Sequence, residues 1–330
     1  MPTRIEISHR TIIFTFFFVF LAWLVSRTLD IILLFFVSVI IMSALKPAVD
    51  LLERYKFPRS LSIILIYVLV WSFLGAVIAG VIPPLVDQTR RLASLFPQAL
   101  ANFNLDNYQQ EITAQVLSRL GSLPESLLRF SISLFGNVIN FFTTIVISFY
   151  LLLERKNYER HLVALMGEKS APRYYRLVVE LEHKLGSWVR GELFLMTAVG
   201  TLTYIGLRIL GMENALPLAI LAGLLEIVPT IGPLISAIPA VIIAFLLHPF
   251  MALSTAALYF LVQFLENNLL VPQVMRKATG VNPLISLLAL MVGFRLAGIA
   301  GALLAIPTIL VFQALKPLTA LTSSLVDNQR

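Results

Sequence analysis

Long runs of residues without a charged side chain dominate this sequence. Residues 60–86 and 130–153 contain no Asp, Glu, Lys or Arg, and further charge-free runs cover 227–265 and 296–315. A helix needs about 20 mostly apolar residues to cross the hydrocarbon core of a bilayer. The alternating segments of about ten residues that mark a transmembrane barrel do not occur here. The runs therefore predict an all-α, polytopic membrane protein.

The composition excludes several soluble classes of protein. Apolar residues make up 58% of the chain and charged residues 13%, whereas soluble domains are about 45–50% apolar and about 25% charged. So little charge cannot cover the surface of a soluble enzyme, a disordered chain or a nucleic-acid reader. The net charge of +7 suits contact with anionic lipid. The chain has no cysteine, so disulfides, thiol nucleophiles and thiolate metal sites are excluded.

Two polar stretches divide the chain. The stretch 154–192 has eight basic and six acidic residues and an apolar stripe at helical spacing. This stripe predicts amphipathic helices at the lipid surface, or a face that packs against a neighbouring subunit. The predicted segments are 1–86 (N-terminal transmembrane helices), 87–129 (external amphipathic region), 130–153 (transmembrane helix), 154–192 (cytoplasmic amphipathic helices), 193–317 (repeat-containing transport core) and 318–330 (C-terminal tail).

The orientation follows from lysine and arginine in short loops, which favour the cytoplasmic side. Basic residues gather before residue 11, between 46 and 59, and within 154–192. One topology places all three groups inside, with both termini cytoplasmic and 87–129 outside. In this topology the charged stretch Arg27–Asp30 is an external turn that joins 11–26 and 31–45 into a helical hairpin.

The C-terminal half contains a repeat. Leu-Pro-Leu at 216–218 corresponds to Asn-Pro-Leu at 282–284, and Ile238-Pro239 corresponds to Ile306-Pro307. The stretches 216–247 and 284–315 are each interrupted by proline or glycine, which loosen or break helices. We expect two re-entrant hairpins in inverted repeats, although full crossings of each half would satisfy the charges equally. The expected helix breaks are Pro239, Pro272, Pro283, Gly298, Gly301 and Pro307.

Polar residues near these breaks are the candidate transport site, because inverted repeats with broken helices are typical of secondary transporters. Glu226 is the only acid between 214 and 265, and a charge at membrane depth usually lines a pathway or has a partner. Helix capping for Glu226, an interfacial helix end for 263–268 and snorkelling for Arg295 stay open as structural alternatives. The predicted substrate or ion pathway comprises Glu226, Pro229, Gly232, Pro233, Gln263, Glu266, Asn267, Asn268 and Arg295.

No catalytic pattern emerges from the sequence. Gly167-Glu168-Lys169-Ser170 lacks the upstream glycine of a phosphate-binding loop, and the four histidines are scattered without metal-ligand spacing. We therefore expect no enzyme activity, no cofactor and no metal site.

The ordered motifs of the C-terminal half resemble those of one family. They are Glu226-Ile-Val-Pro229-Thr-Ile-Gly232-Pro233, Gln263-Phe-Leu-Glu266-Asn267-Asn268 with Pro272, Asn282-Pro283-Leu284, and Gly298-Ile-Ala-Gly301 with Ile306-Pro307. This set is similar to the motifs of the autoinducer-2 exporter family, also called PerM-like permeases. The resemblance implies eight membrane segments, no nucleotide use and a homo-oligomer such as a pentamer in the bacterial cytoplasmic membrane. One mild departure is Gly301-Ala302, where the family usually has Gly-Met.

Three functions remain open at this point. The first is a secondary transporter that exports a small polar solute, similar to autoinducer-2, by alternating access. The second is a Na⁺(Li⁺)/H⁺ antiporter that uses a titrating carboxylate at depth. The third is a membrane scaffold without transport. The expected partners are the solute, a coupling cation or proton, membrane lipid and further copies of the chain, but no nucleic acid.

Overall fold

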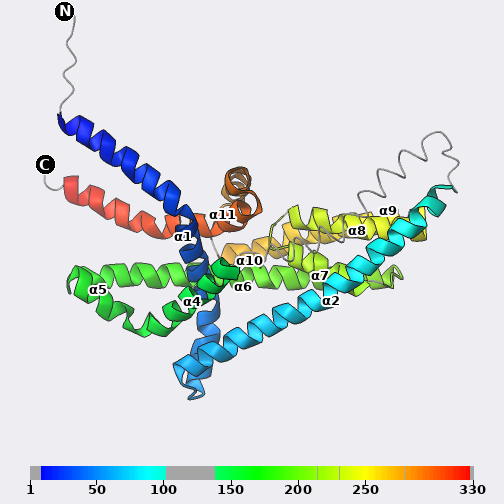
Figure 1. Cartoon of the computed structure of the whole chain (residues 1–330), viewed down its shortest axis with the longest axis horizontal. Helices are drawn as coiled ribbons and strands as arrows, with labels where there is room; N and C mark the ends of the chain where they lie inside the picture. The colour runs from blue at the N-terminus through cyan, green and yellow to red at the C-terminus, as the bar shows by residue number, and fades with distance from the viewer. Residues whose placement is uncertain (1–8, 102–137, 214, 230, 279, 328–330) are drawn as a thin grey trace, which may run out of the picture.

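The computed structural model describes residues 9–101, 138–213, 215–229, 231–278 and 280–327. Every regular element in these ranges is a helix, so the predicted all-α class is confirmed (Figure 1). The longer elements are α1 (His9–Arg54), α2 (Arg59–Ala101), α4 (Val138–Glu154), α6 (Ala171–Ile209), α8 (Ile231–Leu247), α9 (Pro249–Leu265) and α11 (Pro283–Asp327). The shorter ones are η1 (Arg155–Asn157), α5 (Tyr158–Met166), α7 (Ala215–Leu225), η2 (Glu266–Leu270) and α10 (Val271–Ala278).

Among the residues that the structure describes, five helical segments are long and apolar enough to cross a membrane. They are Ile13–Arg54, Arg59–Gly80, Ala171–Ile209, Pro249–Val274 and Leu284–Lys316. Their surfaces expose large apolar side chains, including Phe16 at 73%, Phe260 at 74% and Leu296 at 80%. Apolar patches of this extent are unfavourable in water and favourable against lipid or another protein. The chain is therefore a multi-pass membrane protein.

The expected hairpin at Arg27–Asp30 is wrong. Helix α1 runs through these residues without interruption, and Figure 1 shows one ribbon that bends but does not turn back. No glycine or proline stands between residues 11 and 46 to end the helix. The hydroxyl groups of Ser26 and Thr28 donate to the carbonyls of Trp23 and Leu24 one turn earlier, as helical hydroxyls do.

One helical layer consists of α1, α2 and α4. Its core contains Met42, Val49, Ile63, Tyr67 and Leu152. Buried hydroxyls join the helices as well, since Ser38 Oγ donates to the Thr144 carbonyl at 3.2 Å and the Tyr67 and Ser148 hydroxyls lie 2.5 Å apart. Hydrogen bonds and close packing are what hold helices together in lipid, where apolar burial gives little drive.

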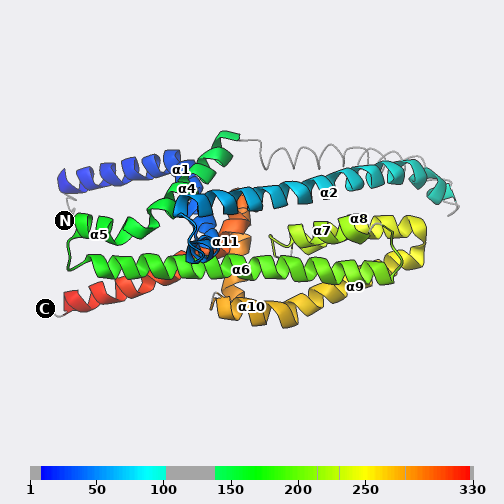
Figure 2. The ribbon, with the colours of Figure 1, turned by 90° about the horizontal axis from the view of Figure 1, so that it is seen from below.

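A second bundle consists of α6 to α9. Helices α7 and α8 form a hairpin that packs between α6 and α9, with Leu207, Leu218, Ala240 and Tyr259 in the shared core. Glycines allow the close approach of α6 and α7, because a Cβ on Gly223 would lie 2.6 Å from the Met196 carbonyl oxygen. Figure 2 shows α6, α7, α8 and α9 running side by side.

The helix is interrupted in both stretches that the sequence predicts to be broken, 216–247 and 284–315. Helix α7 ends at Leu225 and α8 begins at Ile231. In α11 the backbone leaves helical geometry at Ala297 and Gly298, where Gly298 has φ +59°. The chain folds back there, since a Cβ on Gly301 would collide with the Gly293 carbonyl oxygen. The depth of both hairpins and the inversion of the repeats stay predictions.

Several expected break positions lie inside helices instead. Pro239 is within α8, and Gly301 and Pro307 are within the second part of α11. A single proline removes one backbone donor, and packed membrane helices tolerate this loss. Pro283 is the first residue of α11, where its missing N–H is not needed.

The polar stretch 87–129 is partly described. Its first residues continue helix α2 to Ala101. The remainder, including the predicted helix start at Ser122–Glu125, lies outside the described residues. The predicted tail 318–330 continues α11 as far as Asp327.

Candidate functional site

Three glutamates from separate elements are buried in the second bundle. Glu192 lies midway along α6, Glu226 follows the last residue of α7, and Glu266 is the first residue of η2. Their relative exposures are 3%, 0% and 1%. Acidic side chains are almost never buried this fully unless they are paired, so the site needs a physical explanation.

The three carboxyl groups interact with one another. Those of Glu226 and Glu266 lie within hydrogen-bonding range, and Glu192 interacts electrostatically with both. Neither carboxyl oxygen of Glu192 or Glu226 meets a protein donor. A hydrogen bond between Glu226 and Glu266 therefore requires that one of the two carries a proton, since ionised carboxylates only accept. We call Glu192, Glu226 and Glu266 the carboxyl cluster.

One neutral side chain supports the carboxyl cluster. The Gln263 amide nitrogen donates to Glu266 Oε2 at 3.0 Å from one turn earlier in α9. No lysine or arginine among the described residues forms an ion pair with any member of the cluster. The described residues also contain no group of three acidic or histidine side chains placed to hold a metal ion. Within the described part of the chain, the cluster thus carries acidic groups without a compensating basic side chain.

The turn between α7 and α8 places Glu226. The amide of Gly232 donates to the Val228 carbonyl at 2.9 Å, which closes a compact turn around Pro229. Gly232 is buried, and a Cβ at this position would collide with the Leu225 carbonyl oxygen. Only glycine fits there, and this tight closure keeps Glu226 at the hairpin tip. The expectation that free amides cap Glu226 is not met, because its oxygens have no donor.

A π-helical turn places Glu266. Helix α9 widens into η2 over Glu266–Leu270, just before Pro272. Proline has no N–H, and its ring clashes with the carbonyl four residues earlier, so a regular α-helical turn is disfavoured there. The effect of Pro272 is therefore a widened turn, a feature that is frequent at functional sites.

The depth of the cluster follows from helix lengths. Glu192 is 17 residues from the end of α6, and Glu266 is 17 residues from the start of α9, which corresponds to ~25 Å in each case. These outer ends lie together, because Thr255 Oγ1 contacts Met212 Sδ at 3.8 Å. The cluster therefore lies deep in the bundle, and its three carboxyl groups lie at a similar distance from the outer end.

The structure brings together only part of the predicted pathway. Gly232 and Pro233 are buried beside Glu226, and Pro229 is half-buried in the same turn. Asn267 and Asn268 are exposed, and the Asn268 amide donates back to the Phe264 carbonyl. Arg295 is also exposed and forms no ion pair with a described residue. The expected neutralisation of Glu226 or Glu266 by Arg295 does not occur in this conformation.

The sequence analysis does not identify Glu192 as a site residue, because Glu192 is the last residue of the polar stretch 154–192. A signal for it exists in the helical spacing of α6. The buried stripe Leu185, Trp188, Leu195 and Val199 continues through position 192. Whether an acid lies within an apolar helical stripe indicates its burial better than how far it lies along the sequence from a charged segment.

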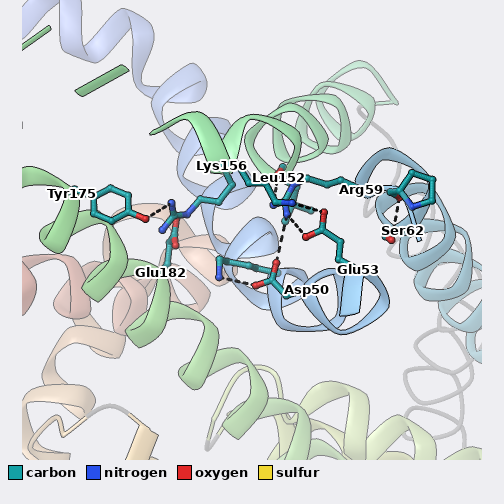
Figure 3. A network of polar contacts seen from close by, with 11 residues as sticks. Asp50, Glu53, Arg59, Ser62, Leu152, Lys156, Tyr175 and Glu182 are labelled. Atoms are coloured by element: carbon teal, nitrogen blue, oxygen red, sulfur yellow. Dashed lines mark hydrogen bonds and ion pairs between the residues drawn. The ribbon is translucent and has the colours of Figure 1, made fainter. Parts of the chain in front are cut away.

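A second polar network joins the first layer to α6 (Figure 3). Arg155 Nε lies 2.5 Å from Glu182 Oε1, with both side chains buried. The guanidinium also lies over the rings of Tyr158 and Tyr175, at 5.2 and 5.3 Å. Burial, together with the charge of Glu182, raises the pKa of Tyr158 to about 12. Tyr158 therefore stays neutral and donates to the Leu151 carbonyl at 3.0 Å.

The same network ties residues 46–59 to residues 154–182. Arg59 pairs with Glu53 at 2.9 Å, and Lys156 reaches Glu53 at 3.1 Å. Lys46 pairs with Asp50 at 2.9 Å. The two basic segments that the charge rule assigned to one side of the membrane are therefore in contact with each other (Figure 3). Which side this is stays a prediction.

Helix content, spanning segments and a buried polar site between broken helices together define a polytopic helical membrane protein with an internal polar site. The model of the AI-2E family transporters matches residues 12–319, and the chain belongs to this family. Two similar Bacillus subtilis proteins each carry the name "Putative transport protein". YrrI is 26% identical over 89% of this chain and 87% of its own, and YueF is 31% identical over 81% and 78%. Escherichia coli YhhT is 34% identical over 33% of this chain and 31% of its own.

Proposed function

We propose that this protein is a proton-coupled secondary transporter that exports a small polar solute by alternating access, with Glu192, Glu226 and Glu266 as the coupling site. The observation that carries the proposal is the burial of three carboxyl groups, from three elements, without a cationic partner. Burying an unpaired charge is very unfavourable. The presence of three such groups in one bundle argues for a role beyond packing.

Protons are the compensating charges that the geometry favours. The carboxyl groups of Glu226 and Glu266 are close enough to share a proton. Like charges at this separation cannot both ionise at low cost, so the pair exchanges a proton as its surroundings change from buried to wet. A coupled transporter needs a group of this kind, whose proton is taken up on one side and released on the other.

The hairpin tip supplies the moving part. Glu226 lies between two helices of unequal length, at a turn closed by Gly232 and Pro233. A change in the angle of α7 and α8 would open the cluster to one side while α6 and α9 keep Glu192 and Glu266 in place. Irregular backbone at membrane depth is tolerated where it lines such a cavity.

A neutral, hydroxyl-rich solute suits the inventory of the site. Carboxylate oxygens and the Gln263 carbonyl accept hydrogen bonds, while few donors are present. The autoinducer-2-like solute that the family description suggests has this chemistry. The solute would then bind in exchange for the shared proton, which couples the two movements.

Exchange of Na⁺ or Li⁺ for protons is the second candidate. Carboxylate and amide oxygens are hard ligands, which suit hard cations. The described arrangement does not provide three metal ligands around one point, so this reading requires the cluster to contract around the ion. The proton-coupled export of a solute requires no such contraction and is preferred.

Reconstituted protein with a trapped pH-sensitive dye tests the proposal. We expect a candidate solute, added as an outward gradient, to drive proton movement through the wild type. Glu192→Gln, Glu226→Gln and Glu266→Gln should each abolish this movement, whereas Glu213→Gln should retain it, since Glu213 is an exposed glutamate between α6 and α7, at the end of the bundle away from the cluster. Proton movement driven by Na⁺ or Li⁺ alone would favour the antiporter. Flux equal to empty liposomes for all solutes and ions would leave only the scaffold.

A further inference from the structure

A groove of about 730 Å³ runs between α2 and α4, on the side of the first layer away from the carboxyl cluster. Its walls include Ile64, Val68 and Trp71 from α2 and Phe142, Phe149 and Tyr150 from α4. These residues follow one face of each helix over two turns, so the groove is ~12 Å long. Figure 2 shows α2 and α4 diverging beyond the start of α2.

The groove opens outward along a helix that is long and apolar enough to span a membrane. Val68, Phe142 and Tyr150 are 60%, 65% and 59% exposed. The α2 wall lies within the candidate span Arg59–Gly80. An apolar, aromatic groove along such a span meets hydrocarbon chains, because lipid is the solvent there.

A basic rim closes one end of the groove. Arg59 donates to the Leu152 carbonyl from Nε at 2.8 Å and from Nη2 at 2.6 Å, and this contact joins α2 to α4 just below Ile64. Arg54 and Lys56 lie on the adjoining turn, exposed and without an ion pair to any described residue. Lys156, which is 66% exposed, lies just beyond the end of α4.

Two acids near this rim, Asp50 and Glu53, are held in ion pairs, whereas Glu154 at the end of α4 is exposed and accepts a hydrogen bond from the Asn157 amide. Asp50 pairs with Lys46, while Glu53 pairs with Arg59 and Lys156. These contacts cancel much of the local negative charge. The charges left facing outward are those of Arg54, Lys56 and part of Lys156 on one side and Glu154 on the other, so the rim keeps a net positive charge.

We propose that this groove binds one anionic phospholipid, with an acyl chain between α2 and α4 and the phosphate at Arg54, Lys56 and Lys156. Basic residues at the interface attract anionic headgroups, and pockets of this kind between membrane helices hold specific lipids. The apolar groove alone would accept any acyl chain. The basic rim selects the headgroup. The bound lipid would hold together the two helices that Arg59 joins, independently of how the transport site works.

Quenching of Trp71 fluorescence tests this site, because Trp71 lines the groove. The substitutions Trp23→Phe and Trp188→Phe leave Trp71 as the single tryptophan. The protein is reconstituted in phosphatidylcholine with a small fraction of brominated phosphatidylglycerol or, in parallel, brominated phosphatidylcholine. We expect stronger quenching by the anionic lipid at equal fraction. Arg54→Gln and Lys56→Gln should each lower this relative affinity about five-fold.

Two further variants act as controls. Lys169→Gln removes a positive charge from an exposed turn between α5 and α6 and should leave the preference unchanged. Val68→Phe narrows the groove and should reduce quenching by both lipids. Equal quenching by both lipids, or a preference that Arg54→Gln and Lys56→Gln do not alter, would overturn the proposal. Weak quenching by both lipids in the parent protein would overturn it too, since protein such as a second copy would then cover the groove.

Discussion

Glu226 and Glu266 are 40 residues apart in the sequence, and they bury their carboxyl groups against each other. One belongs to a sharp turn and the other to a π-helical turn, so both come from irregular backbone. Their closeness is unfavourable when both are charged. This relationship places the α7–α8 turn and the π-helical turn together at the coupling site that we propose.

The first prediction concerns the members of the carboxyl cluster. Glu226→Gln and Glu266→Gln should each reduce transport much more than they reduce membrane insertion, and Glu192→Gln should do the same. Because each change removes like-charge repulsion, the thermal midpoint of the purified variant should stay level or rise. Asn267→Ala should have a smaller effect, since Asn267 is exposed and outside the cluster.

Flux in proteoliposomes over a range of pH, together with thermal unfolding in detergent, measures both effects. At a coupling position, glutamine should also abolish the pH dependence of transport. If the glutamine variants transport at normal rates with normal pH dependence, the carboxyl groups are structural and the transport site lies elsewhere.

The sequence predicted the helical class and two of the three members of the carboxyl cluster. Charge-free runs report spanning helices directly, because length and hydropathy alone decide whether a segment is stable in lipid. Glu226 and Glu266 were found since they interrupt or end such runs. Glu192 was not found, because it stands at the edge of a charged stretch and only its helical phase marks it as buried.

Other features could not be read from the sequence for physical reasons. Proline indicates a weakened helix but does not decide between a turn, a widened turn and an uninterrupted helix. Pro229, Pro272 and Pro239 show these three outcomes in one chain. The sequence could likewise not show whether Arg295 pairs with an acid, because this depends on how α11 packs.

The second prediction concerns the hairpin tip. Gly232→Ala should destabilise the protein by about 1–3 kcal/mol, because the added methyl group would collide with the Leu225 carbonyl oxygen. Gly80→Ala is the matched control, since a Cβ there has nothing within 4 Å. That variant should be neutral or up to about 1 kcal/mol more stable. Thermal unfolding in detergent compares the two, and equal stability of the variants would contradict the tight turn.

The third prediction concerns the buried ion pair of Arg155 and Glu182. Arg155→Met leaves a buried carboxylate without its partner and should cost about 3–5 kcal/mol. The double variant Arg155→Met/Glu182→Leu should recover most of this loss, since it removes both charges. A double-mutant cycle measured by chemical unfolding gives the coupling. Additive effects of the two single changes would show that the pair does not hold η1 to α6.

The fourth prediction concerns orientation. The segment 154–192 should be cytoplasmic and 87–129 external, because basic loops stay inside. The chain has no cysteine, so single cysteines report their own position. A cysteine at exposed Lys169 should resist an impermeant thiol reagent in intact cells, and one at Asn107 should react. The reverse pattern would invert the topology.

The last prediction concerns the re-entrant hairpin of α7 and α8. Both ends of this hairpin lie at the same end of the bundle, next to the contact of Met212 with Thr255. Single cysteines at Glu213 and His248, both exposed, should therefore label from one side of the membrane, opposite to a cysteine at Lys169. His248 caps α9 by accepting from the Phe250 amide at 3.2 Å, so His248→Cys should cost about 1 kcal/mol without changing sidedness. Labelling of positions 213 and 248 from opposite sides would mean that the chain between them crosses the membrane fully. In that case the carboxyl cluster could not lie at a hairpin tip, and the inverted repeat would fail with it.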